Sequence, residues 1–433
     1  MTGSDHTPSR RGRSGFVGAA VRAAILAALP VCSAAAQGIG ASDLQDRRGE
    51  TVLSRSRPDY DPLGVRVGAF TIHTRLTEEM GYNDNVTGAE GSKTGSALLK
   101  TSAYAGVSSI WQRDAVALTA DLFDYRYFDA SDQDYTNWSV GPSGRYDIDR
   151  RWRAYASYRH NVLHELRDDP DSVGASVPLR YTTDVVRLGT RYTFNRLYVQ
   201  PFAIFLAYRY DDAEFPTGTV SQAYRDRNVW FGRMETGYEF SPGRAVFVAV
   251  NLIRSDYVNT PDPGILKLDN KTYEITGGVD YDSDGIWNYR ISAGLRHRVY
   301  DDASRQSVNG LALDARATWR ASPITTLSAT ASTSIEDGSS PGDGGYRDNN
   351  ATLSLDHEYL RNVLLFARGR ARYVDYVSQE RDTVQLTGSV GFDYLINRTL
   401  RVGATYERTQ RFGDRKRDEF DRNVVLFRLS LGL

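Results

Sequence analysis

Leu-Phe-Ala-Arg-Gly-Arg-Ala-Arg-Tyr, the stretch Leu365–Tyr373, alternates charged with apolar or small residues almost one by one. A helix would distribute its arginines around the helix surface. A β-strand has a side-chain period of two, so it places Arg368, Arg370 and Arg372 on one face and the small and apolar residues on the other. The same alternation recurs through the last four-fifths of the chain. It is typical of an all-β, transmembrane, up-and-down antiparallel barrel with an apolar outer face and a wet interior.

The composition favours strands over helices as the membrane-crossing elements. The chain has 433 residues, of which 40% are hydrophobic, with a mean hydropathy of −0.47 and a formal net charge of −1. A membrane-spanning helix needs about 18 or more consecutive apolar residues, and no such run follows the N-terminal segment. A barrel strand needs only every second residue to be apolar. The near-zero net charge offers no basic field for a nucleic-acid partner.

The N-terminus has the three parts of a secretion signal. A basic region at Arg10–Arg13 precedes an apolar stretch at Ala23–Val31, and Ala34–Ala36 offers a small-residue cleavage site. We therefore predict a signal peptide over residues 1–36, which contains the single cysteine, Cys32. A twin-arginine signal at Ser9–Arg11 and a lipoprotein signal ending at Cys32 are the alternatives. Simple secretion is favoured because a barrel must cross the inner membrane unfolded.

The rest of the chain divides in two by its pattern. Residues 37–62 are polar, contain Arg-Pro and Asp-Pro steps and show no periodicity, which predicts a flexible periplasmic segment. Alternation begins at Val65 and continues to Leu433. Residues 63–433 are therefore the predicted outer-membrane barrel, with a first strand at about Val65–Met80.

Short turn signals recur along the barrel region, each preceded by an aromatic residue. The turns are expected at Gln112–Asp114, Asp149–Arg151, Asn195–Arg196, Ser241–Gly243, Ser283–Gly285, Ala321–Pro323, Leu360–Asn362 and Ile396–Arg398. The preceding aromatic residues are Trp111, Tyr146, Tyr192, Tyr238, Tyr281, Trp319, Tyr359 and Tyr394. Tyr and Trp rings suit a membrane interface because they are half apolar and half polar. The recurrence therefore favours an aromatic girdle over ordinary hairpin aromatics.

Longer polar stretches lie between these turns. They cover Tyr82–Ser96, Glu165–Leu179, Asp211–Tyr224, Asn259–Asn270, Glu336–Arg347 and Gln410–Asp421. Short turns on one side and long loops on the other are typical of outer-membrane barrels, whose turns are periplasmic and whose loops are extracellular. The spacing predicts about 18 strands, within a range of about 16–18, and both chain ends on the periplasmic side.

Residue parity assigns a face to each side chain. Val246, Val248, Val250 and Leu252 occupy every second position and are expected to face lipid. The opposite parity carries the expected lumen-lining residues, which are Arg153, Arg159, Arg187, Arg191, Arg290, Arg296, Arg298, Arg316, Arg368, Arg370, Arg372, Arg401 and Arg428. An Arg that faces the bilayer midplane costs about 2–4 kcal/mol, so about a dozen of them must face a wet interior.

Acidic residues share the inward parity, and two interpretations remain open. These residues are Asp121, Glu274, Asp280, Asp314, Asp356, Glu358, Asp393 and Glu407. Opposite charges can pair across strands and fill the lumen with salt bridges. Alternatively, the arginines line a path for anionic solutes, since about 18 strands usually leave an aqueous channel unless a loop or plug fills it.

Signals of catalysis and metal binding are weak. His160 and His164 have helical spacing, but on a strand they stand about 13 Å apart. Asp280–Gly285 opens like a calcium-binding loop, yet Ile291 stands where the bidentate Glu belongs. No G-x-S-x-G elbow, phosphate-binding glycine loop or dinucleotide fingerprint occurs. We therefore predict no enzymatic activity, no cofactor and no metal site.

The basic stretch Arg408–Arg417 is expected in an extracellular loop. One interpretation is that it binds lipopolysaccharide phosphates by charge-assisted hydrogen bonds. The other is an ordinary solvated loop, because Asp418, Glu419 and Asp421 follow directly.

The start of the barrel region resembles a known family. Arg57–Phe70 contains the Pro-Leu-Gly, Arg, Gly and Phe of an entry strand, and Tyr82–Val86 reads Tyr-Asn-Asp-Asn-Val. Together they resemble the outer-membrane family called putative β-barrel porin 2, in which this strand follows a cleaved signal. The resemblance implies an outer-membrane barrel, and some family members are thought to accompany surface-polysaccharide production. The chain departs from many such barrels by ending on Leu433 instead of an aromatic residue.

The residues and the resemblance together predict an integral protein of the bacterial outer membrane. The main hypothesis is a porin-like passive channel for small anionic or sugar-like solutes. Export or assembly of exopolysaccharide and a non-conducting structural barrel are the alternatives. The expected partners are outer-membrane lipid and lipopolysaccharide, the machinery that assembles outer-membrane barrels, and the solute or polysaccharide itself.

Overall fold

The computed structural model describes residues 50–169, 172–259, 268–282, 285–339, 345–377 and 380–433. The predicted signal peptide, its cleavage site near Ala36 and Cys32 lie outside these residues. Within the described ranges, no helix combines the length and the apolar character that a membrane crossing requires.

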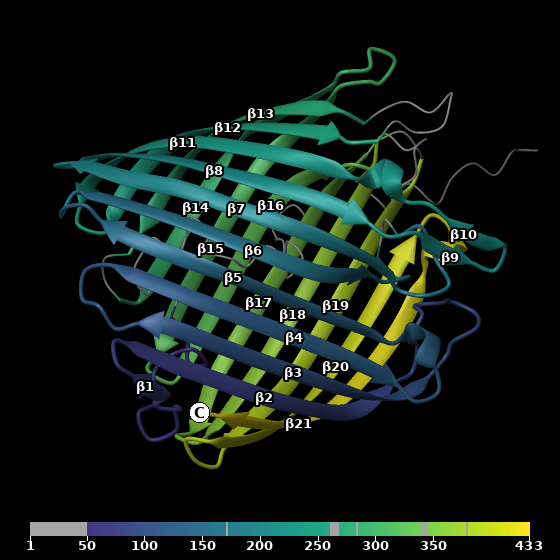
Figure 1. Cartoon of the computed structure of the whole chain (residues 1–433), viewed down its shortest axis with the longest axis horizontal. Coiled ribbons are helices and arrows are strands. Elements are labelled where there is room, and N and C mark those ends of the chain that lie inside the picture. The colour runs from purple at the N-terminus through teal and green to yellow at the C-terminus, as the bar shows by residue number, and fades with distance from the viewer. Residues whose placement is uncertain (1–49, 170–171, 260–267, 283–284, 340–344, 378–379) are drawn as a thin grey trace, which may run out of the picture.

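Eighteen antiparallel strands close into one barrel (Figure 1). The sheet contains 19 strands, but β1 (Val65–Val67) pairs only with the start of β2, so 18 strands form the wall. They are β2 (Phe70–Asn83), β3 (Ser96–Ser109), β4 (Ala115–Tyr127), β5 (Tyr135–Asp147), β6 (Trp152–Glu165), β7 (Leu179–Phe194), β8 (Leu197–Tyr210), β11 (Arg227–Ser241), β12 (Arg244–Tyr257), β13 (Asn270–Tyr281), β14 (Trp287–Tyr300), β15 (Val308–Ser322), β16 (Thr325–Glu336), β17 (Tyr346–Leu360), β18 (Val363–Tyr376), β19 (Asp382–Leu395), β20 (Leu400–Gly413) and β21 (Phe420–Gly432).

Every wall strand pairs with the next one along the chain, and the last pairs with the first. β2 closes on β21, with Arg75 opposite Gly432 and Asn83 opposite Val424. A closed barrel leaves no unpaired strand edge in the membrane, which is the condition for strands to cross it. The predicted up-and-down topology and strand number are confirmed.

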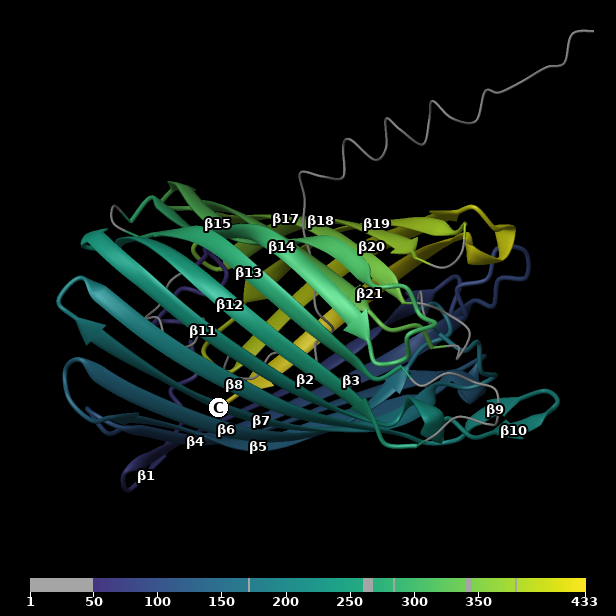
Figure 2. The same ribbon diagram turned by 90° about the horizontal axis from the view of Figure 1, so that it is seen from above.

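The barrel has a turn side and a loop side. The expected turns fall at or between the ends of consecutive strands, which are separated there by two to five residues. The described parts of the six expected loops lie at the opposite end, with three further connections after β4, β14 and β18. Residues 283–284 of one expected turn and residues 170–171, 260–267 and 340–344 of three expected loops lie outside the described residues. The loop after β8 carries a small hairpin, β9 (Ala213–Phe215) and β10 (Gly218–Val220), which projects beyond the wall (Figures 1 and 2). Short helical turns η3 (Ser131–Gln133), η4 (Ala223–Arg225) and η5 (Lys416–Asp418) also lie on the loop side.

Two strand boundaries differ from the expectation. The predicted first strand, Val65–Met80, is interrupted at Gly68, whose φ of 58° permits a tight turn, so that Val67 lies opposite Phe70. The predicted loop Gln410–Asp421 is shorter than expected. β20 continues to Gly413 and β21 begins at Phe420, because pairing extends to Arg411 opposite Phe420.

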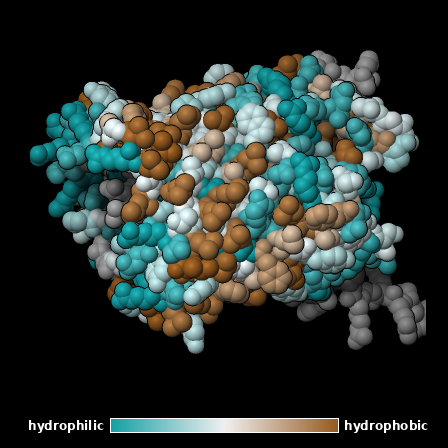
Figure 3. All heavy atoms as spheres, turned by 60° about the horizontal axis from the view of Figure 1, so that its bottom comes forward, coloured by the Kyte–Doolittle hydropathy of each residue, from teal (hydrophilic) through white to brown (hydrophobic). Residues whose placement is uncertain are grey.

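Many outward positions in mid-strand are apolar, as their parity predicts. Val248 and Leu252 are each 53% exposed, and Phe427 is 65% exposed. Figure 3 shows apolar side chains gathered over the middle of the wall and hydrophilic ones toward its ends. Such a belt matches the hydrocarbon layer between two polar interfaces.

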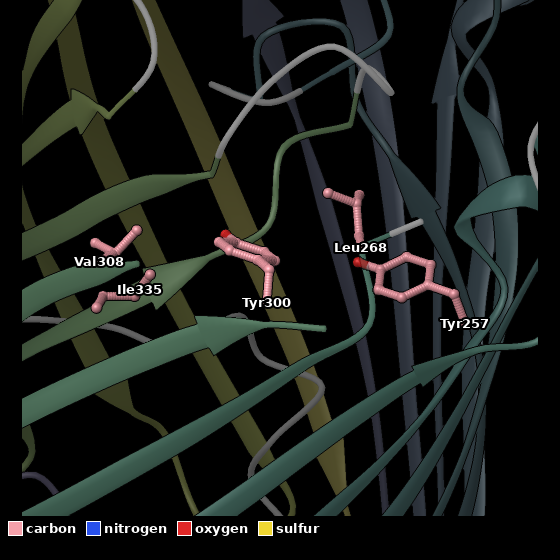
Figure 4. Packing of buried hydrophobic residues seen from close by; sticks show 5 residues of the cluster. All are labelled: Tyr257, Leu268, Tyr300, Val308 and Ile335. Carbon is pink, nitrogen blue, oxygen red and sulfur yellow. The ribbon is translucent and has the colours of Figure 1, made fainter. Parts of the chain in front are cut away.

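Buried apolar side chains form only small clusters. The largest that the described residues form joins Tyr257, Leu268, Tyr300, Val308 and Ile335 at the loop-side ends of β12 to β16 (Figure 4). The other clusters contain two or three buried residues each. No continuous apolar core therefore fills the described part of the barrel, and polar contacts organise much of its interior.

Candidate functional site: the inner wall and its two mouths

Carboxylates hold many of the inward arginines. The two nitrogens Nη2 and Nη1 of Arg290 lie 2.7 Å from Glu235 Oε2 and 2.9 Å from Asp280 Oδ2. Further pairs join Arg153 to Asp147, Arg159 to Asp121, Arg296 to Glu274, Arg298 to Asp337, Arg372 to Asp348, Arg401 to Asp61, and Arg428 to both Glu79 and Asp393. A salt-bridge lattice thus covers much of the wall. It fixes guanidinium groups in place and neutralises them.

Three of the arginines predicted to line the lumen lack this neutralisation. Among the described residues, no carboxylate pairs with Arg316, Arg368 or Arg370. Arg370 donates from Nη2 to Asn350 Oδ1 at 2.8 Å, and Arg368 lies over the ring of Phe366 at 5.1 Å. Both contacts orient the guanidinium without cancelling its charge. These side chains therefore carry positive charge that an anion can meet.

The strand register joins two of these arginines to a continuous polar row. Moving from strand to strand, the facing positions are Arg290, Arg316, Thr330, Thr352, Arg370, Thr387, Thr409 and Arg422. We call this set the arginine–threonine row. Because neighbouring strands lie about 4.8 Å apart, its seven steps cover about 34 Å.

The arginine–threonine row climbs through the barrel from one end to the other. Arg290 is the fourth residue of β14, which starts at the turn side, and Arg422 is the third residue of β21, which starts at the loop side. The climb follows from the tilt of barrel strands, which makes any hydrogen-bonded row oblique to the barrel axis. The row therefore connects the two mouths with hydrogen-bond donors.

The loop after β6 reaches along the loop-side mouth to β20 and β21, which are not neighbours of β6 in the wall. Arg422 on β21 donates from Nη1 to Asp168 Oδ2 at 2.7 Å, and Arg411 on β20 donates to the carbonyl oxygen of Asp168 at 2.6 Å. Burial, together with the adjacent Asp168 carboxylate, raises the pKa of Asp169 to about 7. Two carboxyl groups are thus held beside the upper end of the arginine–threonine row.

A second loop-side segment reaches across the mouth. Asp337, directly after β16, accepts from Arg298 Nη1 at 2.7 Å and from the Tyr257 hydroxyl at 3.0 Å. Two residues later, the carbonyl oxygen of Ser339 accepts from the Tyr224 hydroxyl at 2.8 Å. These contacts hold the start of this loop against η4, β12 and β14.

The N-terminal segment lies in the turn-side mouth. Val52 is 2% exposed and packs with Leu364 of β18 and Leu395 of β19, two inward apolar residues. The backbone nitrogen of Val52 donates to Thr326 Oγ1 at 3.2 Å. We expected residues 37–62 to be a flexible segment. Of these, residues 50–62 make defined contacts inside the barrel, because the apolar Val52 finds a partner surface there.

Ion pairs reinforce this N-terminal contact. Arg57 Nη2 lies 2.9 Å from Glu358 Oε2, which Arg55 also contacts, and Arg401 Nη2 lies 3.1 Å from Asp61 Oδ1. A cavity of about 840 Å³ remains between the segment and the wall, with Arg75 and Tyr104 among its lining residues. The turn-side mouth is therefore narrowed but keeps a water-accessible space.

The expected site residues occupy the following places. All the arginines listed in the sequence analysis lie at inward parity, alternating with the exposed apolar positions. Among those not yet placed, Arg191 lies 3.8 Å from the centre of the Tyr198 ring and Arg187 is buried on β7. The expected girdle residues lie near the turn-side strand ends, where Trp319 stacks on Trp287 at 5.3 Å. Their roles in conduction and anchoring stay predictions.

Sequence reasoning missed three residues that shape the lumen. Asp168 belongs to a polar loop with no periodic pattern, and Val52 is one apolar residue in a polar segment. Glu235 lies on β11, where the alternation is weak. Inward parity on β11 would have identified Glu235, whereas no local signal identifies partners of Asp168 and Val52 in distant strands. In the described ranges, no three His, Cys, Asp or Glu residues are grouped as metal ligands.

The chain matches one protein family over nearly the whole barrel. The model of the family described as putative beta-barrel porin 2 matches residues 57–432. Among curated proteins, none matches this chain in sequence.

Three similar solved structures come from Pseudomonas. The crystal structure of OpdK from Pseudomonas aeruginosa with vanillate has a TM-score of 0.44 and 10% identity, and the likeness covers 84% of this chain and 99% of that one. OccK2 (OpdF) from the same organism, in complex with glucuronate, has a TM-score of 0.45 and 12% identity, covering 84% and 98%. A BenF-like porin from Pseudomonas fluorescens Pf-5 has a TM-score of 0.45 and 10% identity, covering 85% and 100%.

Proposed function

Because the chain belongs to the putative beta-barrel porin 2 family and is an integral barrel of the outer membrane, we propose that it is a passive channel for small anionic solutes. One observation carries this proposal. The arginine–threonine row connects both mouths, and Arg316 and Arg370 within it have no carboxylate partner in the described part of the chain. Fixed guanidinium charge attracts anions and lowers the cost of removing their hydration shell.

The spacing of the row suits transport more than tight binding. A solute that leaves one arginine meets threonine hydroxyls about 4.8 Å further on, before it reaches the next arginine. Several weak sites in sequence favour passage, because a single strong site would retain the solute. The neutralised arginines elsewhere on the wall hold the barrel shape and add little net charge.

Uptake into proteoliposomes tests the charge preference. The purified mature protein is reconstituted, and uptake of glucuronate, glucose and glucosamine is compared, since these sugars are similar in size and differ in charge. We expect glucuronate to enter fastest and glucosamine slowest. Equal rates for the three sugars would remove the anionic preference, and no uptake of any of them would favour a closed, structural barrel.

A further inference from the structure

The outer surface of the barrel has a groove over β16 to β20. Two adjoining cavities of about 660 and 580 Å³ lie there, and they share Leu353, Gly369, Gly388 and Arg408. Leu353 is 56% exposed and belongs to the outward parity, so the groove opens toward the hydrocarbon and not into the lumen. We call this feature the outer groove.

Small residues form the floor of the outer groove. Gly369 on β18 lies opposite Gly388 on β19, and a Cβ atom placed on either glycine would meet no atom within 4 Å. Ala351 and Ala371, which face each other on β17 and β18, continue this floor. The outward positions of β12 and β21, by contrast, carry Val, Leu or Phe in mid-strand. The missing side-chain volume on adjacent strands therefore leaves a hollow.

Arg408 gives the outer groove a charge. It alternates with Tyr406 and Phe412 on the outward face of β20, and its side chain is 44% exposed. Its Nη1 donates to Asn423 Oδ1 at 3.0 Å, while its nearest carboxylate contact, to Asp421, is 3.8 Å. A guanidinium on the lipid face is unfavourable unless it reaches the interface or pairs with an anion.

The apolar floor and the charged Arg408 of the outer groove match the acyl chain and the anionic headgroup of a lipid in the outer leaflet. β20 runs from the turn side to the loop side, and the Arg408 guanidinium reaches toward Asn423 and Asp421 near the loop-side start of β21, so its charge is directed toward the extracellular end of the groove. An acyl chain fits the apolar floor, and an anionic headgroup fits the guanidinium at its upper end. We propose that the outer groove binds lipopolysaccharide, with one acyl chain in the hollow and a phosphate group paired with Arg408.

Charge complementarity is the reason to favour this lipid over a second copy of the chain. The groove offers a cation directed toward the extracellular end of the wall, and lipopolysaccharide supplies phosphate and acyl chains in one molecule. This proposal also changes how the basic stretch Arg408–Arg417 is understood. Of its basic residues, only Arg408, on the lipid-facing side of β20, lines the outer groove.

Binding of purified lipid A to the detergent-solubilised mature barrel tests the proposal. Native mass spectrometry compares phosphorylated lipid A with its dephosphorylated form on the wild type, on Arg408→Gln and on Gly388→Leu. We expect the phosphorylated form to bind better, and Arg408→Gln to weaken its binding about tenfold through loss of a charge-assisted contact. Gly388→Leu fills the hollow and should weaken both lipid forms.

Gly232→Leu provides the matched control. Gly232 faces outward on β11, on the other side of the barrel, and a Cβ atom there also meets nothing within 4 Å. Heat-modifiable migration on gels verifies that each variant is folded. Equal binding of the two lipid forms, or undiminished binding by both groove variants, would overturn the proposal. A change of oligomeric state in Gly388→Leu without a change in lipid binding would instead assign the groove to a second copy of the chain.

Discussion

Arg422 on β21 donates from Nη1 to Asp168 Oδ2 at 2.7 Å, although Asp168 lies in the loop after β6 and 254 positions away in sequence. Four wall strands, β2 to β5, separate β21 from β6 along the closed sheet. The loop must therefore leave its own strand and cross toward a distant part of the wall. This one contact places a carboxylate at the upper end of the arginine–threonine row, where it narrows the extracellular mouth.

The contact predicts that Asp168→Asn enlarges the extracellular mouth. Charge-assisted hydrogen bonds contribute about 1.5–3 kcal/mol, so their weakening shifts the balance toward an undocked loop by about tenfold or more. Single-channel recording in planar bilayers should show a higher conductance. Asp211→Asn is the matched control, because Asp211 pairs with the exposed Arg180 away from the row. Unchanged conductance in Asp168→Asn would show that the loop does not limit the current.

The raised pKa of Asp169 predicts that docking of the same loop depends on pH. The pKa of its carboxyl is raised to about 7 by burial and by the adjacent Asp168, from an ordinary value of 3.8. Because the docked state has the higher pKa, docking is most favourable below about pH 3.8 and is weakened as the pH rises through about 7. Conductance should therefore be higher at pH 8 than at pH 5.

Asp169→Asn isolates this effect. The amide cannot ionise, so the variant should keep the low conductance of pH 5 at both values. Asp302→Asn, in the exposed loop after β14, should retain the wild-type response. The assignment to Asp169 would be wrong if its Asn variant showed the same pH response as the wild type.

Charge reversal at Arg370 should change ion selectivity. Replacing Arg370 by Glu changes the lumen charge by two units, and one unit at about 4 Å in water-like surroundings is worth about 1 kcal/mol. The ratio of anion to cation permeability should thus fall by about tenfold or more, as measured from the reversal potential in a salt gradient. Arg408→Glu is the control for the effect of the strand face. Because Arg408 faces outward, this substitution should leave the reversal potential unchanged.

The packing of Val52 predicts that the N-terminal segment narrows the periplasmic mouth. Val52→Asp would place a carboxylate between Leu364 and Leu395, and an unpaired buried charge costs several kcal/mol. The segment should leave the mouth, raise the conductance and become sensitive to trypsin at Arg55 and Arg57. Val65→Asp, at a 51% exposed position of β1, should change neither readout. Persistent protection of Arg57 in Val52→Asp would contradict the packing argument.

Alternation by itself determined the barrel and the two faces of its wall, and the spacing of the turn and loop signals predicted about 18 strands. Arg368, Arg370 and Arg372 had to share a face because the strand period is two, and that face had to be wet because lipid-facing guanidinium groups cost too much free energy. The same period of two places Arg408 on the lipid-facing side of β20. The sequence analysis had wrongly expected Arg408 in an extracellular loop. These conclusions need only local order, which a sequence contains.

Only the tertiary structure decided which arginines have a carboxylate partner. It also decided which segments narrow the lumen. Arg290 is neutralised by Glu235, three strands away in the wall, while Arg370 finds Asn350 on the adjacent strand and no described carboxylate. Asp168 and Val52 contact residues of strands that are distant in sequence, which the closed barrel brings beside the segments that contain them. Such contacts depend on strand tilt, register and loop path, because these bring together residues that share no local pattern.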